Sequence, residues 1–136
     1  MRIFLDANIL FSAADPPSPT ARVIRLLLDR GDAVTCEYAQ EEARRNVELK
    51  RPAWAADFAT LMHEIEIVPA QVFALPVTLA EKDVPILCSA IRARCTYLIT
   101  SDKRDFGHLY EQTVQDVTIS TLLHLAKMLL DPDHQS

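Results

Sequence analysis

Apolar and polar positions change along this chain in a pattern that predicts strands and helices in turn. Short apolar runs predict strands over residues 2–5, 33–36, 65–68, 96–100 and 117–119. Longer stretches with helical spacing predict helices from Ser18 or Thr20 to Arg30 and over residues 37–50, 53–64, 83–94 and 120–130. Residues 70–77 are predicted to be a loop or an irregular edge. The alternation predicts one α/β domain over residues 1–130, with a largely parallel central sheet flanked by helices and a flexible tail at 131–136.

The predicted helix over residues 37–50 separates two adjacent glutamates. At about 100° per residue, Ala39, Ala43 and Val47 form the buried face of this helix. Glu42 lies beside that face, whereas Glu41 falls on the charged side. We therefore expect Glu42 to point inward and Glu41 to lie on the surface.

Several acids fall where an α/β sheet binds its ligands, beyond the carboxyl ends of the strands. Asp6 directly follows the first strand, although burying an unpartnered carboxylate is costly. Asp102 follows the strand at 96–100, Asp105 comes three residues later, and Asp83 opens the helix before that strand. Together with Glu42, these side chains are the candidate acids of one cleft.

Carboxylates gathered in one cleft repel each other, so they take up protons or bind a cation. Mg²⁺ prefers oxygen ligands, and Mn²⁺ accepts the same set. Such ions activate water and offset charge on a leaving oxygen, so the acids point to phosphodiester hydrolysis.

Each acid also has a purely structural interpretation. Asp6 can accept backbone N–H groups at a strand end, Asp83 can cap a helix, Asp102 and Asp105 can form a turn, and Glu42 can pair with Arg45 or Asn46. The combination of acids from separate elements is what favours the metal interpretation.

Composition narrows the function classes. The 136 residues carry a net charge of −5, which disfavours nucleic-acid binding driven by overall charge. Basic residues nevertheless cluster locally: Arg44, Arg45, Lys50 and Arg51; Arg92 and Arg94; Lys103 and Arg104. The two glycines, Gly31 and Gly107, are far apart, which argues against a Gly-rich phosphate loop.

The predicted compartment is the cytoplasm. The three cysteines, Cys36, Cys88 and Cys95, have neither the number nor the spacing of a disulfide framework or a zinc site, and we expect core thiols. The start lacks the features of a signal peptide, and no apolar run reaches the roughly 18 residues of a membrane span, so no membrane partner is expected.

The sequence resembles the PIN-domain family over essentially its whole length. The strand followed by Asp-x-Asn is IFLDANILFSA; the strand and Glu-bearing helix are AVTCEYAQEEARRNV. The third motif is KDVPILCSAIRARCTYLITSDKRDF, and the closing strand and helix are VTISTLLHLAKML. This chain departs from the pattern at Cys36, where the family often has Ser.

The resemblance implies a metal-dependent nuclease, usually a ribonuclease, that uses Mg²⁺ or Mn²⁺. Many small stand-alone PIN proteins of this VapC-like kind are toxins of toxin–antitoxin pairs. Transferred by motif, Asp6, Glu42, Asp83 and Asp102 are the catalytic, metal-binding acids, and Asp105 is a possible fifth ligand. The supporting residues are Asn8, Thr100 and Ser101, and the weaker RNA contacts are Arg44, Arg45, Lys103 and Arg104.

The implied reaction is attack of an activated water on an RNA phosphodiester, which leaves a 5′-phosphate product. Glu42 would bind the metal or orient the water. The implied partners are RNA with exposed single-stranded bases, an antitoxin protein and a second copy of the chain in a homodimer, which the apolar residues around 72–77 also suggest. Asp116 is expected to have a surface role.

Three alternative functions were compared with the sequence, and two of them lack residues that they require. A receiver-type phosphoacceptor needs an acidic pair after the first strand, which Asp6 lacks, and a haloacid-dehalogenase-type phosphatase needs Asp where Asn8 stands. A catalytically inactive PIN-like module that binds RNA or protein fits the same fold, because fold alone does not establish activity.

Overall fold

The computed structural model describes residues 1–131. The strands are β1 (Arg2–Leu5), β2 (Asp32–Cys36), β3 (Glu66–Val68), β4 (Tyr97–Ile99), β5 (Thr113–Val114) and β6 (Val117–Ser120). The helices are α1 (Ala7–Ala13), α2 (Pro19–Arg30), α3 (Glu37–Lys50), α4 (Ala55–Met62), α5 (Val84–Arg92), α6 (Lys103–Phe106) and α7 (Leu122–Leu130). Short 3₁₀ turns lie at Pro52–Trp54, Glu81–Asp83 and Gly107–Leu109.

The strands form one six-stranded sheet in the order β3-β2-β1-β4-β6-β5. All neighbouring strands are parallel except β5, which pairs antiparallel with β6 at one edge. In the centre, Phe4 of β1 lies opposite Val34 of β2 and Leu98 of β4. The predicted α/β class and largely parallel sheet are confirmed.

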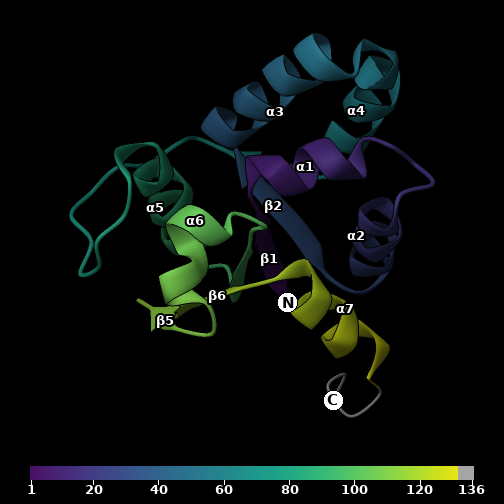
Figure 1. The fold of residues 1–136 in the computed structure, drawn as a ribbon. Coiled ribbons are helices and arrows are strands. Elements are labelled where there is room, and N and C mark those ends of the chain that lie inside the picture. Colours follow the sequence, from purple (N-terminus) through teal and green to yellow (C-terminus); the bar gives the residue numbers. More distant parts are fainter. Residues whose placement is uncertain (132–136) are drawn as a thin grey trace.

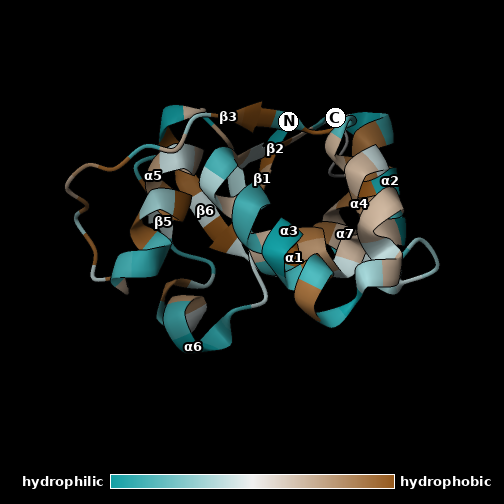
Figure 2. Ribbon diagram, turned by 90° about the horizontal axis from the view of Figure 1, so that it is seen from above, coloured by the Kyte–Doolittle hydropathy of each residue, from teal (hydrophilic) through white to brown (hydrophobic). Residues whose placement is uncertain are grey.

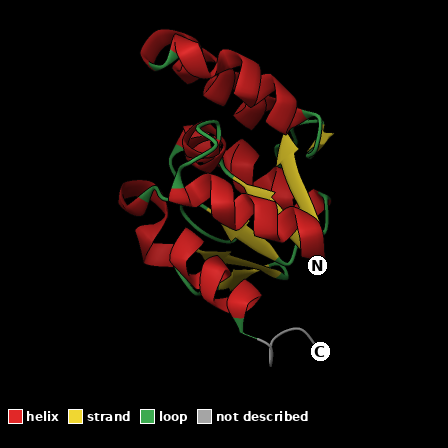
Figure 3. Ribbon diagram, turned by 90° about the vertical axis from the view of Figure 1, so that its right-hand side faces the viewer, coloured by secondary structure: helices red, strands yellow, loops and turns green. Residues whose placement is uncertain are grey.

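Helices cover both faces of the sheet (Figures 1 and 3). Helices α2 and α7 pack against each other on one face, and α5 contacts β2 and β4 on the other. Helices α3 and α4 form a hairpin above α1. Fully buried apolar side chains from the central strands, among them Ile3, Phe4 and Leu98, form the core. Hydrophilic residues gather on α3 and α6 (Figure 2).

Three elements were not expected from the sequence. Helix α1 buries Ala7, Ile9, Leu10 and Ala13 and has no charged residue, so its pattern looked like an apolar run. Helix α6 has four residues, and β5 has two, which is too short for any periodicity to be visible. Residues Gln115 and Asp116 between β5 and β6 both have positive φ, as tight two-residue hairpins require.

Other boundaries differ by a few residues. Ser18 caps α2, and its hydroxyl accepts the N–H of Ala21 at 3.1 Å. Helix α7 begins later than predicted because Ser120 belongs to β6 and Thr121 caps the helix. The predicted helix at 53–64 is a 3₁₀ turn followed by the shorter α4.

The segment between β3 and the turn at Glu81–Asp83 has no regular structure, as expected. It is attached to α5, because the thiol of Cys88 hydrogen-bonds both the N–H and the carbonyl of Phe73 at 3.4 Å. The N–H of Gln71 donates to the hydroxyl of Ser89 at 3.0 Å. These contacts hold the segment against the middle of α5, the helix that follows Asp83.

Cys36, Cys88 and Cys95 are buried and free, which confirms the core-thiol interpretation. Within the described part of the chain, every helix is too short or too polar to cross a bilayer. The division into a domain at 1–130 and a tail at 131–136 stays a prediction, because residues 132–136 lie outside the described residues.

Candidate active site

The candidate site lies at the carboxyl ends of β1 and β4, the two central strands. The chain moves from β1 outward to β2 and β3, then returns to the other side of β1 with β4. This reversal is the topological switch point where open α/β sheets bind ligands. Asp6 is the first residue after β1, and its N–H donates to the carbonyl of Ile99 in β4 at 3.1 Å.

Asp6 is held rigidly by its neighbours. Its side chain is 4% exposed, and one carboxylate oxygen accepts the N–H of Ala7 at 2.7 Å, which caps α1. The other oxygen accepts the hydroxyl of Thr100 at 2.8 Å and the amide of Asn8 at 3.3 Å. Thus the strand-end role considered for Asp6 is real, and it coexists with a position beside the other acids.

Asn8 and Thr100 join the two central strands at this point. The amide nitrogen of Asn8 also donates to the Thr100 hydroxyl at 3.3 Å, while its oxygen accepts the N–H of Ser101 at 3.1 Å. The Thr100 hydroxyl accepts the N–H of Asp102 at 3.1 Å. The three residues expected to support the acids therefore form one hydrogen-bonded network with Asp6 and the backbone of Asp102.

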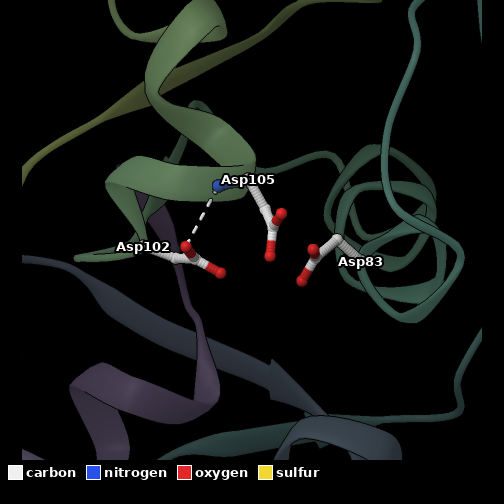
Figure 4. A group of neighbouring side chains, drawn as sticks. All are labelled: Asp83, Asp102 and Asp105. Carbon is white, nitrogen blue, oxygen red and sulfur yellow. Dashed lines mark hydrogen bonds between the residues drawn. The ribbon is translucent and has the colours of Figure 1, made fainter.

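Three aspartates converge beside this network. Asp83, Asp102 and Asp105 each offer a carboxylate oxygen within 4.8 Å of the others, and Figure 4 shows the three groups turned toward one another. We call these three residues the aspartate cluster. Asp102 also caps α6 by accepting the N–H of Asp105 at 3.1 Å. Asp83 occupies the first position before α5, but its side chain makes no capping hydrogen bond there.

The ammonium group of Lys82 lies among these carboxylates. Its Nζ is 2.8 Å from Asp105, 2.9 Å from Asp83 and 3.3 Å from Asp102. Although burial lowers it, hydrogen bonds to Asp105 and Asp83 raise the pKa of Lys82 well above its usual value. Lys82 therefore stays charged and balances part of the negative charge of the aspartate cluster.

The acids perturb one another as a shared cleft requires. Burial is the main cause that raises the pKa of Asp6 to about 6, and the charges of Asp83 and Glu42 add to it. Burial likewise raises the pKa of Asp83, which the Lys82 ammonium partly offsets. Hydrogen bonding to Lys82 lowers the pKa of Asp105. Asp6 thus lies close enough to both Asp83 and Glu42 to interact with them electrostatically.

Helix α3 separates its two glutamates as the periodicity predicted. Ala39, Ala43 and Val47 are buried, and Glu42 is half-buried beside them. Glu41 instead is exposed and pairs with Arg44. No hydrogen bond joins Glu42 to Arg45 or Asn46 in the described structure.

Cys36 precedes α3 and makes no capping hydrogen bond through its side chain. Burial raises the pKa of the Cys36 thiol. The buried thiol is therefore a packing group.

The basic residues fall into two groups. Lys103 and Arg104 are exposed on α6, next to Asp102 and Asp105. Arg44 is different, because its guanidinium contacts Glu41 and Glu48 at 2.5 Å on the outer face of α3. Its charge is neutralised by these glutamates, which weakens the expectation that it contacts RNA.

Arg45 and Asp116 are both exposed. Arg45 is exposed and close enough to lower the pKa of Tyr38, which burial and the charge of Glu42 raise overall. Asp116 is exposed in the turn before β6, at the opposite end of that strand from Ser120 and the site.

Two residues near the acids were missed. Lys82 gave no signal beyond its place before Asp83, because sequence does not say where a long side chain ends. The hydroxyl of Tyr110 donates to the carbonyl of Thr100 at 3.1 Å and so holds the end of β4 from outside. Burial first, then the charges of Asp102 and Asp6, raise the pKa of Tyr110.

The aspartate cluster fits a hard divalent cation. Its ligand atoms are all carboxylate oxygens, which Mg²⁺ and Mn²⁺ prefer, and a cationic group already lies among them. Asp83 is buried, and the side chains of Asp102 and Asp105 are each 21% exposed, so the cluster opens to solvent on one side.

Comparison with known proteins identifies the fold. No protein-family model matches the chain, and no curated protein matches its sequence. Among solved structures, VapBC2 from Rickettsia felis bound to a DNA fragment from its promoter matches with a TM-score of 0.64 and 15% identity. The match covers 89% of this chain and 98% of that one.

Two further structures match over most of their length. FitAB bound to the IR36 DNA fragment gives a TM-score of 0.63 at 18% identity and covers 90% of this chain and 96% of the other. Mycobacterium tuberculosis VapC20, a toxin that cleaves the sarcin-ricin loop, gives 0.58 at 7% identity, with coverage of 82% and 98%. At these identities the likeness concerns the fold, which confirms the resemblance stated above: this chain has the PIN-domain fold of the VapC-type toxins.

Proposed function

We propose that this protein is a divalent-metal-dependent endoribonuclease. The observation that carries the proposal is the convergence of Asp83, Asp102 and Asp105 at the switch point of the sheet, with Asp6 and Glu42 beside them. The fold supports the proposal, because VapC20, which shares this fold, is described as a sarcin-ricin loop cleaving toxin.

The acids have different tasks in the proposed reaction. Asp83, Asp102 and Asp105 hold Mg²⁺ or Mn²⁺, and Asp6 adds a buried negative charge behind them. When bound, such an ion supplies an activated water and offsets charge on the leaving oxygen. Glu42 is free of ion pairs in the described structure, so its carboxylate is available to orient that water and accept its proton.

The supporting groups fix these acids in place. Asn8 and Thr100 donate to the carboxylate of Asp6, and Thr100 also accepts the N–H of Asp102, so one network sets the spacing of both acids. Arg45, Lys103 and Arg104 lie at the rim and bind the RNA backbone. Arg44 is left out, because its charge is paired with two glutamates.

The proposed setting is a cytoplasmic toxin–antitoxin pair. VapBC2 and FitAB are described bound to DNA. Their likeness to this chain supports an antitoxin protein as its partner. A homodimer is proposed as well, and Val72, which is 72% exposed in the irregular segment before α5, is a candidate contact. Analytical ultracentrifugation of the pure protein measures the mass and decides between monomer and dimer.

The experiment that tests the function is cleavage of a labelled, structured RNA by the purified protein with Mn²⁺, Mg²⁺ or EDTA. Asp102→Asn removes a cluster carboxylate at constant size, and Asp116→Asn makes the same change in the distant hairpin turn. We expect metal-dependent cleavage that is lost in the first variant and kept in the second.

Two results would count against the proposal. Cleavage that persists in EDTA would mean that the acids act without a metal. Absence of both cleavage and Mn²⁺ binding would favour the inactive PIN-like module that binds RNA or protein.

A further inference from the structure

Lys82 reaches the aspartate cluster from outside the sheet. It belongs to the 3₁₀ turn at Glu81–Asp83, and its side chain is 53% exposed although its ammonium group lies among three carboxylates. The stem therefore runs along the solvent side, and only its charged end enters the cluster. A change of side-chain rotamer is enough to withdraw it, with no movement of the backbone.

The ammonium group uses the same oxygens that a divalent ion would need. It contacts both oxygens of Asp83, at 3.1 and 2.9 Å, and one oxygen each of Asp102 and Asp105. Figure 4 shows these carboxylates facing a common space. Two cations cannot share those oxygens at short distance, because like charges repel strongly in a partly buried site.

We propose that Lys82 is a built-in counter-cation that occupies the site in the metal-free protein and must leave it when a divalent ion binds. This inference rests on the proposed function, since it concerns the same carboxylates. It assigns Lys82 a role in setting metal affinity: the ammonium keeps the three acids together without metal, and it weakens metal binding because it has to be displaced.

The test is the affinity for Mn²⁺, measured by isothermal titration calorimetry in the absence of RNA. Lys82→Met removes the charge and shortens the unbranched side chain by one atom. Lys127→Met is the matched control, because Lys127 is an exposed lysine on α7, away from the site, and forms no ion pair among residues 1–131. We expect the Lys82 variant to bind Mn²⁺ on the order of tenfold more tightly than wild type, and the control to change by less than about twofold.

A second measurement follows Lys82 itself. In a spectrum of ¹⁵N-labelled lysine ammonium groups, Lys82 should give a slowly exchanging signal in the metal-free protein, assigned by its loss in Lys82→Met. Titration with Mg²⁺ should remove that signal while those of other lysines persist. The Lys82→Met protein should also melt at a lower temperature in EDTA and gain more from Mn²⁺ than wild type does.

The outcomes separate the two proposals. If wild type binds Mn²⁺ and Lys82→Met binds it equally or more weakly, the role assigned to Lys82 is wrong and the nuclease proposal stands. If neither protein binds Mn²⁺, the metal site itself is wrong, and the inference falls with it. If only Lys82→Met binds Mn²⁺, displacement of the ammonium is confirmed in its strongest form.

Discussion

Asp6 accepts three hydrogen bonds but forms no ion pair with any residue from 1 to 131, so its negative charge has a cost. Burial raises its pKa from 3.8 to about 6, which means that the folded protein favours the protonated form. The free energy of unfolding that the protonated form of Asp6 contributes is fully present below about pH 4. It is lost as the pH rises through 6. At pH 7 the ionised carboxylate therefore costs about 3 kcal/mol in the metal-free protein.

Replacement of Asp6 by Asn should remove that cost. We expect Asp6→Asn to raise the free energy of unfolding in EDTA at pH 7 by about 2 kcal/mol, after about 1 kcal/mol is lost in weaker hydrogen bonds to Ala7 and Thr100. Urea unfolding at pH 7 and pH 4 measures it, and the gain should disappear at the lower pH. An equally stable variant at pH 7 would show that Asp6 carries no such penalty. Asp116→Asn is the exposed control.

Glu41 and Glu42 provide a matched pair for the proposed chemistry. Glu42→Gln removes the group that orients and deprotonates the water, so we expect cleavage with Mn²⁺ to fall about 10²-fold or more. Glu41→Gln makes the same change one residue away, on the exposed face, and should leave the rate within about twofold. The comparison is made from initial rates on one RNA. Equal losses in the two variants would remove Glu42 from the mechanism.

At the scale of elements, the end of α2 depends on Gly31, the residue that directly follows this helix. A Cβ added at this residue would lie 2.6 Å from the carbonyl oxygen of Met1, a backbone atom next to β1. We expect Gly31→Ala to destabilise the fold by about 1–3 kcal/mol, because the start of β1 has to shift. Gly107→Ala is the control, since its nearest atom would be 4.0 Å away. Thermal unfolding of the two variants measures the difference, and equal melting temperatures would contradict it.

Elements also show what the sequence could and could not predict. Helix α3 was located to the residue, because Ala39, Ala43 and Val47 repeat at helical spacing along a strongly polar segment. Helix α1 was missed since it is apolar on most sides, and α6 because four residues contain about one turn. Short or uniformly apolar elements carry little periodic signal.

The candidate site could also be predicted from the sequence only in part. The acids were found because each follows a predicted strand, opens a predicted helix or lies on a predicted helix face. That they share a cleft was expected, but their detailed arrangement was not: Asp105 lies in the aspartate cluster with Asp83 and Asp102, whereas Asp6 lies beside it. Lys82 was missed because contacts between residues 20 apart in sequence depend on tertiary packing, which no local pattern encodes.

At the scale of the whole molecule, a net charge of −5 has to be reconciled with the proposed RNA substrate. On the proposed function, exposed cations beside the site attract the RNA backbone locally. Arg104 on α6 should contact a phosphate. We expect Arg104→Ala to weaken binding of single-stranded RNA in EDTA and to reduce the slope of log K against log salt by about 0.7. Fluorescence anisotropy at several salt concentrations measures the slope.

Arg44→Ala is the control for this prediction, because it removes the same charge from an arginine that is paired with Glu41 and Glu48. Its salt slope should equal that of wild type. A reduced slope in Arg44→Ala and an unchanged one in Arg104→Ala would move the RNA path from α6 to the outer face of α3.

The central place of β1 between β2 and β4 has a consequence for synthesis of the chain. Among the acids of the site, Asp6 leaves the ribosome first. The aspartate cluster also needs Asp102 and Asp105, and these follow β4, the strand that pairs with β1. A nascent chain that ends before residue 102 therefore lacks two of the three cluster ligands. On the proposed function, the growing polypeptide stays harmless to the RNA around it until most of the protein has been translated.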